Sequence, residues 1–223
     1  MPSLITHDFF GRDVYDRLFG TIGGSRDEAE AFLLGNQGPD PLFYAVLSPR
    51  LRAHRRLGST MHSKKPTELV KALKDALSIL NGAELPIGRA YALGFLCHYA
   101  LDSTAHPLVY FHEYRLCDAG EPGLSRADGS EVHSLIESEL DELTLFTRRG
   151  QTVATFDPSA EILKASDFVL HVVSKLYVYL ALTVYGEIVP ERLFTIAVKD
   201  FRAAQRFFHS PSGRKRARSE EHT

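Results

Sequence analysis

The sequence has few cysteines and no recognisable secretory signal. Cys97 and Cys117 are the only two cysteines, which is too few for a disulfide scaffold and is compatible with a reducing compartment. The first eight residues lack a basic stretch followed by a long apolar one, so no secretory signal is expected. These two absences together predict a cytoplasmic protein.

The chain also lacks a hydrophobic run of the length that a membrane span needs, which is about 20 residues. Residues 90–101 are apolar but too few, and residues 168–185 are interrupted by His171, Ser174 and Lys175. Both stretches are typical of buried helices, so no transmembrane segment is expected.

No excess of one charge is present, because 26 Lys and Arg face 28 Asp and Glu, for a net charge of -2. This balance gives no general attraction to nucleic acid or to an anionic membrane, and no stable nucleic-acid partner is expected. Any ligand must therefore be held by local groups. A group of basic residues lies near the end of the chain, within residues 210–223. This segment has almost no apolar side chains and is predicted to be a disordered tail.

Strand signals are nearly absent, whereas apolar residues recur with the period of a helix along the chain. With 223 residues, 44% of them hydrophobic, the chain is predicted to form one all-α, multi-helix domain over residues 1–209. Thr6 and Ser130 are expected to be N-caps. The expected helices cover about residues 6–19, 25–34, 66–81, 88–106, 130–147 and 159–186, with a break allowed in the last, and a final helix begins at Pro190.

Asp40 stands in a loop, residues 35–41, that is too rich in Gly and Pro to be helical throughout. Because Pro41 disfavours the α conformation of the residue before it, Asp40 is expected to lie on extended backbone.

Histidine and acidic residues recur at helical spacing in two places. His98, Asp102 and His106 are four residues apart, and four residues advance about 40° around a helix, so these side chains share one face. His133 and Glu137 repeat this spacing beside the apolar stripe of Val132, Leu135, Ile136, Leu140 and Leu143. Each set has an ordinary alternative. Asp102 could simply fix a core histidine through a hydrogen bond, and His133 and Glu137 could be a pair on a helix surface.

Three further residues, His7, Asp40 and His62, are weak signals individually, since solvated loop histidines and turn aspartates are common. Taken with the two helical sets, however, they make five histidines and three carboxylates. This chemistry suits zinc better than calcium or a thiolate site.

The order of these residues resembles that of the zinc-dependent phospholipase C family, whose fold is shared with the fungal single-strand-specific nucleases. The resemblance spans about residues 5–141 and is strongest over residues 94–107. The matching series is His7, Gly38-Pro39-Asp40, Met61-His62, His98, Asp102, His106, His133 and Glu137.

The resemblance implies an all-helical domain that holds two or three zinc ions in a cleft and hydrolyses phosphate esters. The first zinc would be held by Asp40, His62, His98 and Asp102. The second would be held by His106, His133 and Glu137. The third would be bound by His7, with Asp102 as the bridge to the first, although this chain has no tryptophan like the one that completes the third site in secreted members.

By the same resemblance, the zinc ions would neutralise phosphoryl oxygens and lower the pKa of a bound water, and Asp40 would be the catalytic proton acceptor. The predicted function is therefore that of a phosphodiesterase or phospholipase C-like hydrolase whose substrate is a phosphate ester, with a phospholipid favoured. Two alternatives stay open: a nuclease-like phosphodiesterase, and a non-catalytic helical module that zinc stabilises. The sequence leaves the oligomeric state open.

Overall fold

The structure is a computed structural model that describes residues 4–208. It is 78% helical, and no strand occurs among the described residues, which confirms the all-α prediction. The predicted tail, residues 210–223, lies outside the described residues. The α-helices are α1 (Leu4–Ile22), α2 (Arg26–Gly35), α3 (Leu57–Ser63), α4 (Pro66–Ala76), α5 (Leu85–Cys117), α6 (Gly129–Arg149), α7 (Pro158–Glu161), α8 (Asp167–Tyr185) and α9 (Leu193–Phe208). The short 3-10 helices are η1 (Asp40–Leu47), η2 (Pro49–His54), η3 (Leu77–Ile79) and η4 (Arg126–Asp128).

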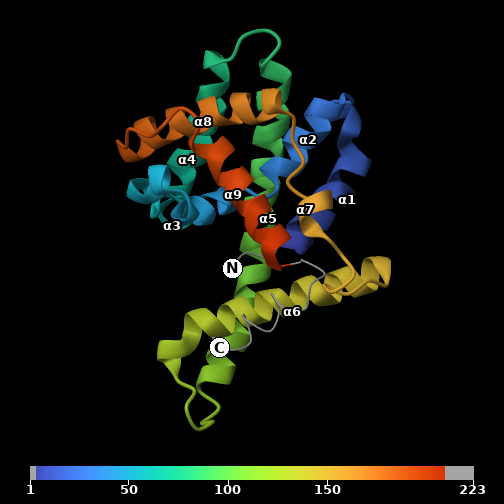
Figure 1. The fold of residues 1–223 in the computed structure, drawn as a ribbon, viewed down its shortest axis with the longest axis vertical. Helices are drawn as coiled ribbons and strands as arrows, with labels where there is room; N and C mark the ends of the chain where they lie inside the picture. The colour runs from blue at the N-terminus through green and yellow to red at the C-terminus, as the bar shows by residue number, and fades with distance from the viewer. Residues whose placement is uncertain (1–3, 209–223) are drawn as a thin grey trace.

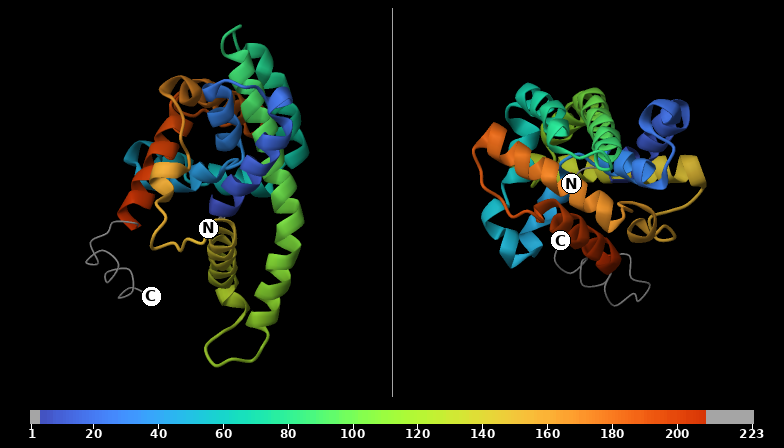
Figure 2. Two further views of the ribbon diagram at one scale, coloured as in Figure 1. Left: turned by 90° about the vertical axis from the view of Figure 1, so that its right-hand side faces the viewer. Right: turned by 90° about the horizontal axis from the view of Figure 1, so that it is seen from above.

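Helix α5 has 33 residues and runs through the length of the molecule (Figures 1 and 2). Its first half is surrounded by the other helices, and its second half pairs with α6 in an arm that projects from them. We call residues 106–149 the hairpin and the other described residues the body. The distinction matters because the two parts contribute different candidate ligands.

The body is built around a close crossing of α2 and α5. Two glycines meet there: a Cβ on Gly94 would lie 2.0 Å from the backbone oxygen of Phe32, and a Cβ on Gly35 would lie 2.3 Å from that of Tyr91. Because neither glycine has a side chain, the two backbones approach closely. The crossing places residues 36–40, which directly follow α2, against the middle of α5.

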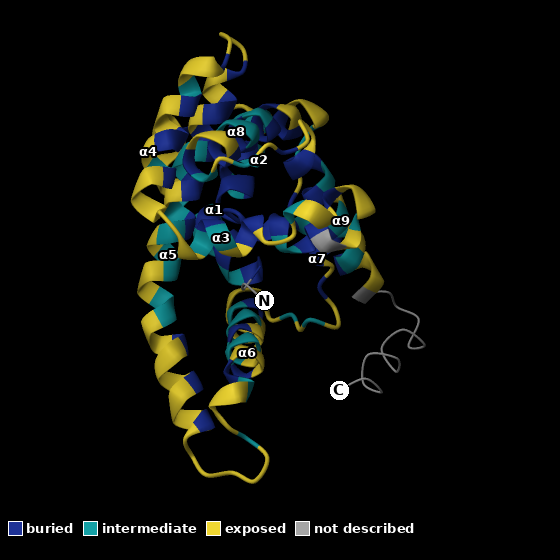
Figure 3. Cartoon of the chain, turned by 90° about the vertical axis from the view of Figure 1, so that its left-hand side faces the viewer, coloured by how far each residue is buried: buried dark blue, intermediate teal, exposed yellow. Residues whose placement is uncertain are grey.

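Helix α8 lies in the core of the body, where Tyr177 is fully buried and stacks on Phe194. Of the described helices, α8 alone has the length and apolar composition that could cross a membrane, but 56% of its apolar window is buried inside the chain. The burial agrees with the predicted core helix. Figure 3 shows the contrast with the hairpin, most of which is exposed.

Two predictions about the N-terminal half are wrong. Thr6 is not an N-cap, because α1 begins at Leu4. Asp40 is not on extended backbone, because it is the first residue of η1, with Pro41 directly after it. A proline is favourable in the first turn of a helix, where its missing N–H has no partner to lose, and this preference outweighs the restriction on the residue before it.

The hairpin differs most from the prediction. Helix α5 does not end near His106 but continues through Pro107 to Cys117. The helix α6 begins at Gly129, with Asp128 as its N-cap, so Ser130 is not the cap. Of the predicted apolar stripe on α6, Val132 is buried but Leu135 and Leu143 are exposed, because α6 packs mainly on α5 and has little of the body over its outer side.

The C-terminal helices follow the prediction more closely. The break allowed within residues 159–186 is present, because α7 ends at Glu161 and α8 begins at Asp167. The last helix begins at Leu193, three residues after the predicted Pro190.

Candidate metal centre

Four segments of the body bring five candidate ligands together, which we call the body cluster. His7 comes from α1, Asp40 from η1, His62 from α3, and His98 and Asp102 from α5. Asp102 lies between two imidazoles, with Oδ1 3.1 Å from Nε2 of His7 and Oδ2 3.2 Å from Nε2 of His98. Oδ1 of Asp40 lies 2.8 Å from Nε2 of His62.

Backbone carbonyls orient two of the imidazoles. Nδ1 of His98 is 3.2 Å from the oxygen of Asn36, and Nδ1 of His62 is 2.8 Å from that of Gly58. A carbonyl can only accept a hydrogen bond, so each contact assigns a proton to Nδ1, and in the neutral ring this leaves the lone pair on Nε2. The Nε2 atoms are the ones that face the carboxylates of the cluster.

The loop before Asp40 is fixed by two tyrosines and by a close approach to His98. The hydroxyl of Tyr177 donates to the oxygen of Gly38 at 2.8 Å, and it lies 2.8 Å from the hydroxyl of Tyr91. Gly38 has a φ of 51°, and a Cβ there would lie 2.3 Å from the ring of His98. Only glycine therefore allows this loop to lie directly on the imidazole.

Asp141 of α6 ties the hairpin to the first turn of α1. Its carboxylate accepts hydrogen bonds from the backbone N–H groups of Ile5 and Thr6, at 2.9 and 2.8 Å, and from the Thr6 hydroxyl at 2.7 Å. Asp141 thus performs from another helix the capping role that was predicted for Thr6. Burial raises the pKa of Asp141 to about 6, although these hydrogen bonds act in the opposite direction.

The hairpin holds the other three candidate ligands, His106, His133 and Glu137, which we call the hairpin cluster. Oε1 of Glu137 lies 3.4 Å from Nε2 of His106 and 3.2 Å from Nε2 of His133. The opposite nitrogen of His133, Nδ1, lies 2.9 Å from Oε2 of Glu113. His133 is therefore held between two carboxylates.

The polar atoms of the two clusters converge as metal ligands do. In each of three groups of residues, one candidate ligand atom per residue lies within 4.8 Å of the corresponding atoms of the other two residues. The groups are His7, Asp40 and His98; His62, His98 and Asp102; and His106, His133 and Glu137. Within the described part of the chain, Nε2 of His98 and both oxygens of Asp40 are buried and make no hydrogen bond of good geometry, although His98 lies in ion-pair range of Asp102 and Asp40 in that of His62. Such atoms are costly to bury unless a further group satisfies them, and a cation at their centre would do so.

The charges of the body cluster also favour a cation. Burial lowers the pKa of His62, but the contact with Asp40 and its charge outweigh this effect and raise the value to about 9. Burial lowers the pKa of His98 to about 4, so its ring is neutral at pH 7. Contacts with His7 and His98 hold the pKa of Asp102 below its usual range, against the effect of burial. The carboxylates of buried Asp40 and partly exposed Asp102 thus attract positive charge to this site.

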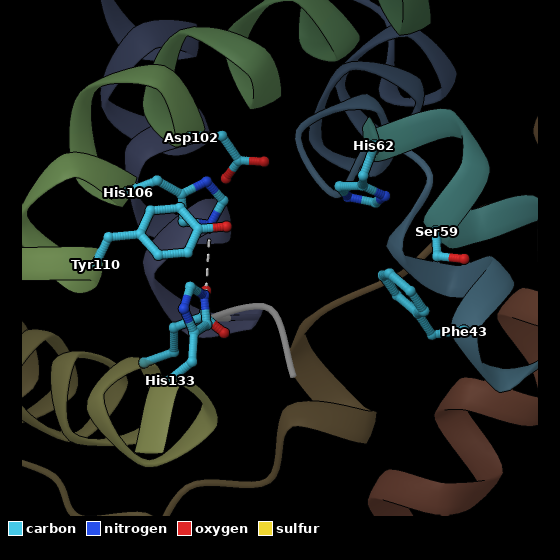
Figure 4. Close-up of a pocket in the computed structure, with 8 residues that line it drawn as sticks. Phe43, Ser59, His62, Asp102, His106, Tyr110 and His133 are labelled. Atoms are coloured by element: carbon cyan, nitrogen blue, oxygen red, sulfur yellow. Dashed lines mark hydrogen bonds and ion pairs between the residues drawn. The ribbon is translucent and has the colours of Figure 1, made fainter. Parts of the chain in front are cut away.

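Both clusters open onto one cavity of about 430 Å³. Figure 4 shows His106, Tyr110 and His133 on one wall and Phe43, Ser59 and His62 on the other. Asp102 and Glu137 also line the cavity, whereas Asp40 is only 1% exposed and does not belong to this lining. The site is therefore open to a ligand on one side, unlike a fully closed structural metal site.

All eight residues of the predicted series lie in one or other cluster. Some functional candidates were not found from the sequence: Glu113, Tyr110 and Ser59. The usable signal for Glu113 was its position seven residues after His106, on the same face of one helix, but this signal exists only if α5 continues past Pro107.

A comparison with known families decides the relationship. The family model for zinc-dependent phospholipase C matches residues 6–185. The chain belongs to this family. The zinc-dependent phospholipase C assignment supports zinc as the metal and, in general, a phospholipase C-like hydrolase. No curated protein and no solved structure matches the chain significantly.

Proposed function

We propose that this member of the zinc-dependent phospholipase C family hydrolyses a phosphodiester in the cavity between body and hairpin, using two or three zinc ions. The observation that carries the proposal is the convergence of three ligand groups beside one open cavity, with buried Asp40 and His98 atoms that make no hydrogen bond of good geometry.

The body cluster would hold one zinc through Asp40, His62, His98 and Asp102, and the hairpin cluster would hold a second. His7 would take part in a third site, supported by its grouping with Asp40 and His98. When bound, zinc supplies Lewis-acid chemistry, which neutralises phosphoryl oxygens and lowers the pKa of water.

Asp40 is proposed first as a ligand, because its oxygens are buried and do not line the cavity. Its role as the catalytic proton acceptor stays a prediction from the family resemblance. An Asp40→Asn variant that keeps its zinc but loses activity would support the proton-acceptor role, and a variant that loses zinc would support the ligand role.

The rest of the cavity lining favours a phosphate ester with an apolar group. Phe43 and Tyr110 stand on opposite walls, and no Lys or Arg is among the described residues of the lining. Burial raises the pKa of Tyr110, so its hydroxyl stays protonated and can donate a hydrogen bond to a phosphate oxygen. A polyanionic nucleic acid would need basic groups along its path, so a phospholipid is the preferred substrate.

The test is to purify the protein and measure its zinc content, then assay short-chain phosphatidylcholine, a bis-aryl phosphodiester and single-stranded DNA. We expect hydrolysis of the lipid or the aryl diester that a chelator abolishes and added zinc restores. His171→Ala, on the exposed side of α8, is the control that leaves zinc content and activity unchanged.

Activity on DNA alone would favour the nuclease-like alternative. Zinc-loaded protein without activity on any of the three substrates would favour the non-catalytic module. A chain that binds no zinc would contradict the proposal. A cytoplasmic location also stays a prediction, which fractionation of cells with an antibody to the protein can test.

A further inference from the structure

Glu113 lies in the second half of α5, outside the family series of ligands, and is nevertheless buried, with 9% of its surface exposed. Its Oε2 atom is 2.9 Å from Nδ1 of His133. On the other side of the same ring, Nε2 faces Oε1 of Glu137 at 3.2 Å. Burying a carboxylate is costly, so a buried carboxylate that contacts the outer nitrogen of a candidate ligand needs a structural reason.

The fold provides a place built for this carboxylate. Seven residues are about two helical turns, so Glu113 lies below His106 on one face of α5 and opposite the start of α6. Gly129, the first residue of α6, leaves the space that Glu113 fills, since a Cβ there would lie 2.8 Å from Oε1 of Glu113. The first turn of a helix has partial positive charge, which favours a carboxylate beside it.

We propose that Glu113 is a positioning residue for the metal subsite of the hairpin. Its carboxylate accepts the proton of His133 Nδ1, which fixes the tautomer and the ring orientation and leaves the lone pair of Nε2 facing His106 and Glu137. The negative charge also makes the imidazole a stronger donor to a cation. This inference rests on the proposed function, because it assumes that the hairpin cluster binds zinc.

A side chain that orients a ligating histidine is needed more in the hairpin than in the body. In the body cluster, the backbone oxygens of Asn36 and Gly58 orient His98 and His62. His133 has a side chain that is 18% exposed, and its outer nitrogen contacts a carboxylate rather than a carbonyl. A ring in this position could turn toward solvent unless a side chain held it.

The experiment compares zinc binding by the wild type, Glu113→Ala, Glu113→Gln and His133→Ala, each at full length. Zinc per chain is measured by elemental analysis after dialysis, and zinc affinity by competition with a chromophoric chelator. Glu142→Gln, an exposed change on α6, is the matched control. The melting temperature of each variant separates loss of fold from loss of metal.

We expect Glu113→Ala to weaken one zinc site about 10- to 100-fold, the range measured when such outer partners of metal ligands are removed. Glu113→Gln keeps an acceptor oxygen and nearly the same volume, so its affinity is expected between those of the wild type and Glu113→Ala. It also keeps the test valid if the alanine variant fails to fold. In both variants the zinc of the body cluster stays bound.

Wild-type zinc count and affinity in Glu113→Gln and in folded Glu113→Ala would overturn the role of Glu113 while leaving the proposed function intact. A wild type that binds no more zinc than His133→Ala would overturn the hairpin subsite itself, and the role of Glu113 with it.

Discussion

The body and hairpin clusters offer similar side chains to one cavity but are held in different ways. The body cluster joins residues from four segments, and backbone oxygens within a packed core orient two of its three imidazoles, those of His62 and His98. The hairpin cluster joins two helices that follow one another in the chain, and the side chain of Glu113 orients its central histidine. Candidate ligands in the core therefore also contribute to the stability of the fold, whereas we expect ligands on the hairpin to be lost with the fold intact.

The largest expected effect is a difference in stability between two variants of α5. One changes a histidine of the body cluster, and the other changes a histidine of the hairpin cluster. His98→Ala removes a fully buried ring and leaves Asp102 without one of its partners, so it is expected to lower the free energy of unfolding by about 3 to 5 kcal/mol and to remove zinc. His106 has a side chain that is 32% exposed, and His106→Ala is expected to cost less than about 1 kcal/mol while it removes one zinc.

Urea unfolding of the metal-free proteins in the presence of a chelator measures the stability, and elemental analysis of separate zinc-loaded samples measures the zinc content. Equal losses of stability in the two variants would contradict the proposed difference between the clusters.

A second, smaller effect tests how tightly the Asp40 loop packs on the body cluster. Gly38→Ala would place a Cβ within 2.3 Å of the His98 ring, whereas Gly150→Ala adds a Cβ at a similar positive φ with nothing within 4 Å. Both variants are destabilised by a non-glycine residue in the left-handed conformation. The difference between their stabilities therefore measures the clash with His98 alone. We expect Gly38→Ala to be less stable than Gly150→Ala by about 3 kcal/mol, near the upper end for overpacking.

Thermal unfolding followed by circular dichroism gives the comparison between these two glycine variants. Similar melting temperatures would show that the loop can move away from His98 without cost.

The smallest expected effect concerns the link between hairpin and body, and it depends on pH. The pKa of Asp141 is raised to about 6 in the folded protein, above the value of about 4 for an unfolded chain. Between these two values the folded state holds a proton that the unfolded state has released, so this group's contribution to stability is greatest below about pH 4 and declines as the pH rises through about 6, by at most about 2.7 kcal/mol for two pKa units.

Asp141→Asn cannot titrate, so the stability of the wild type relative to this variant is expected to fall between about pH 4 and pH 7. Urea unfolding of both proteins in the presence of a chelator tests this. Parallel pH profiles would mean that the Asp141 carboxylate has an ordinary pKa.

The sequence predicted what depends on local spacing. The common face of His98, Asp102 and His106 follows from a period of about 3.6 residues, and the all-helical class follows from the same period along the chain. Bringing His7, Asp40 and His62 to that face depended on the family resemblance, because no local pattern relates segments so distant in sequence.

What the sequence could not show depends on tertiary contacts. Pro107 predicts a helix end, but α5 continues because its second half packs on α6, and the position of Glu113 was therefore missed. Asp141 was missed for a similar reason, since the backbone groups of Ile5 and Thr6 that it binds are more than 130 residues away. Interactions of this kind have no signature in a single sequence.

The buried pair of Tyr91 and Tyr177 determines which parts of the candidate metal centre respond to pH. Burial raises the pKa of both phenols far above neutrality, so both remain protonated at neutral and at acidic pH. The hydrogen bond from Tyr177 to the oxygen of Gly38 is consequently kept when the pH falls below neutrality. The pKa values of His62 and His98, about 9 and about 4, lie far below those of the phenols. Protonation therefore alters candidate ligands of this centre while the loop that presents Asp40 keeps its place.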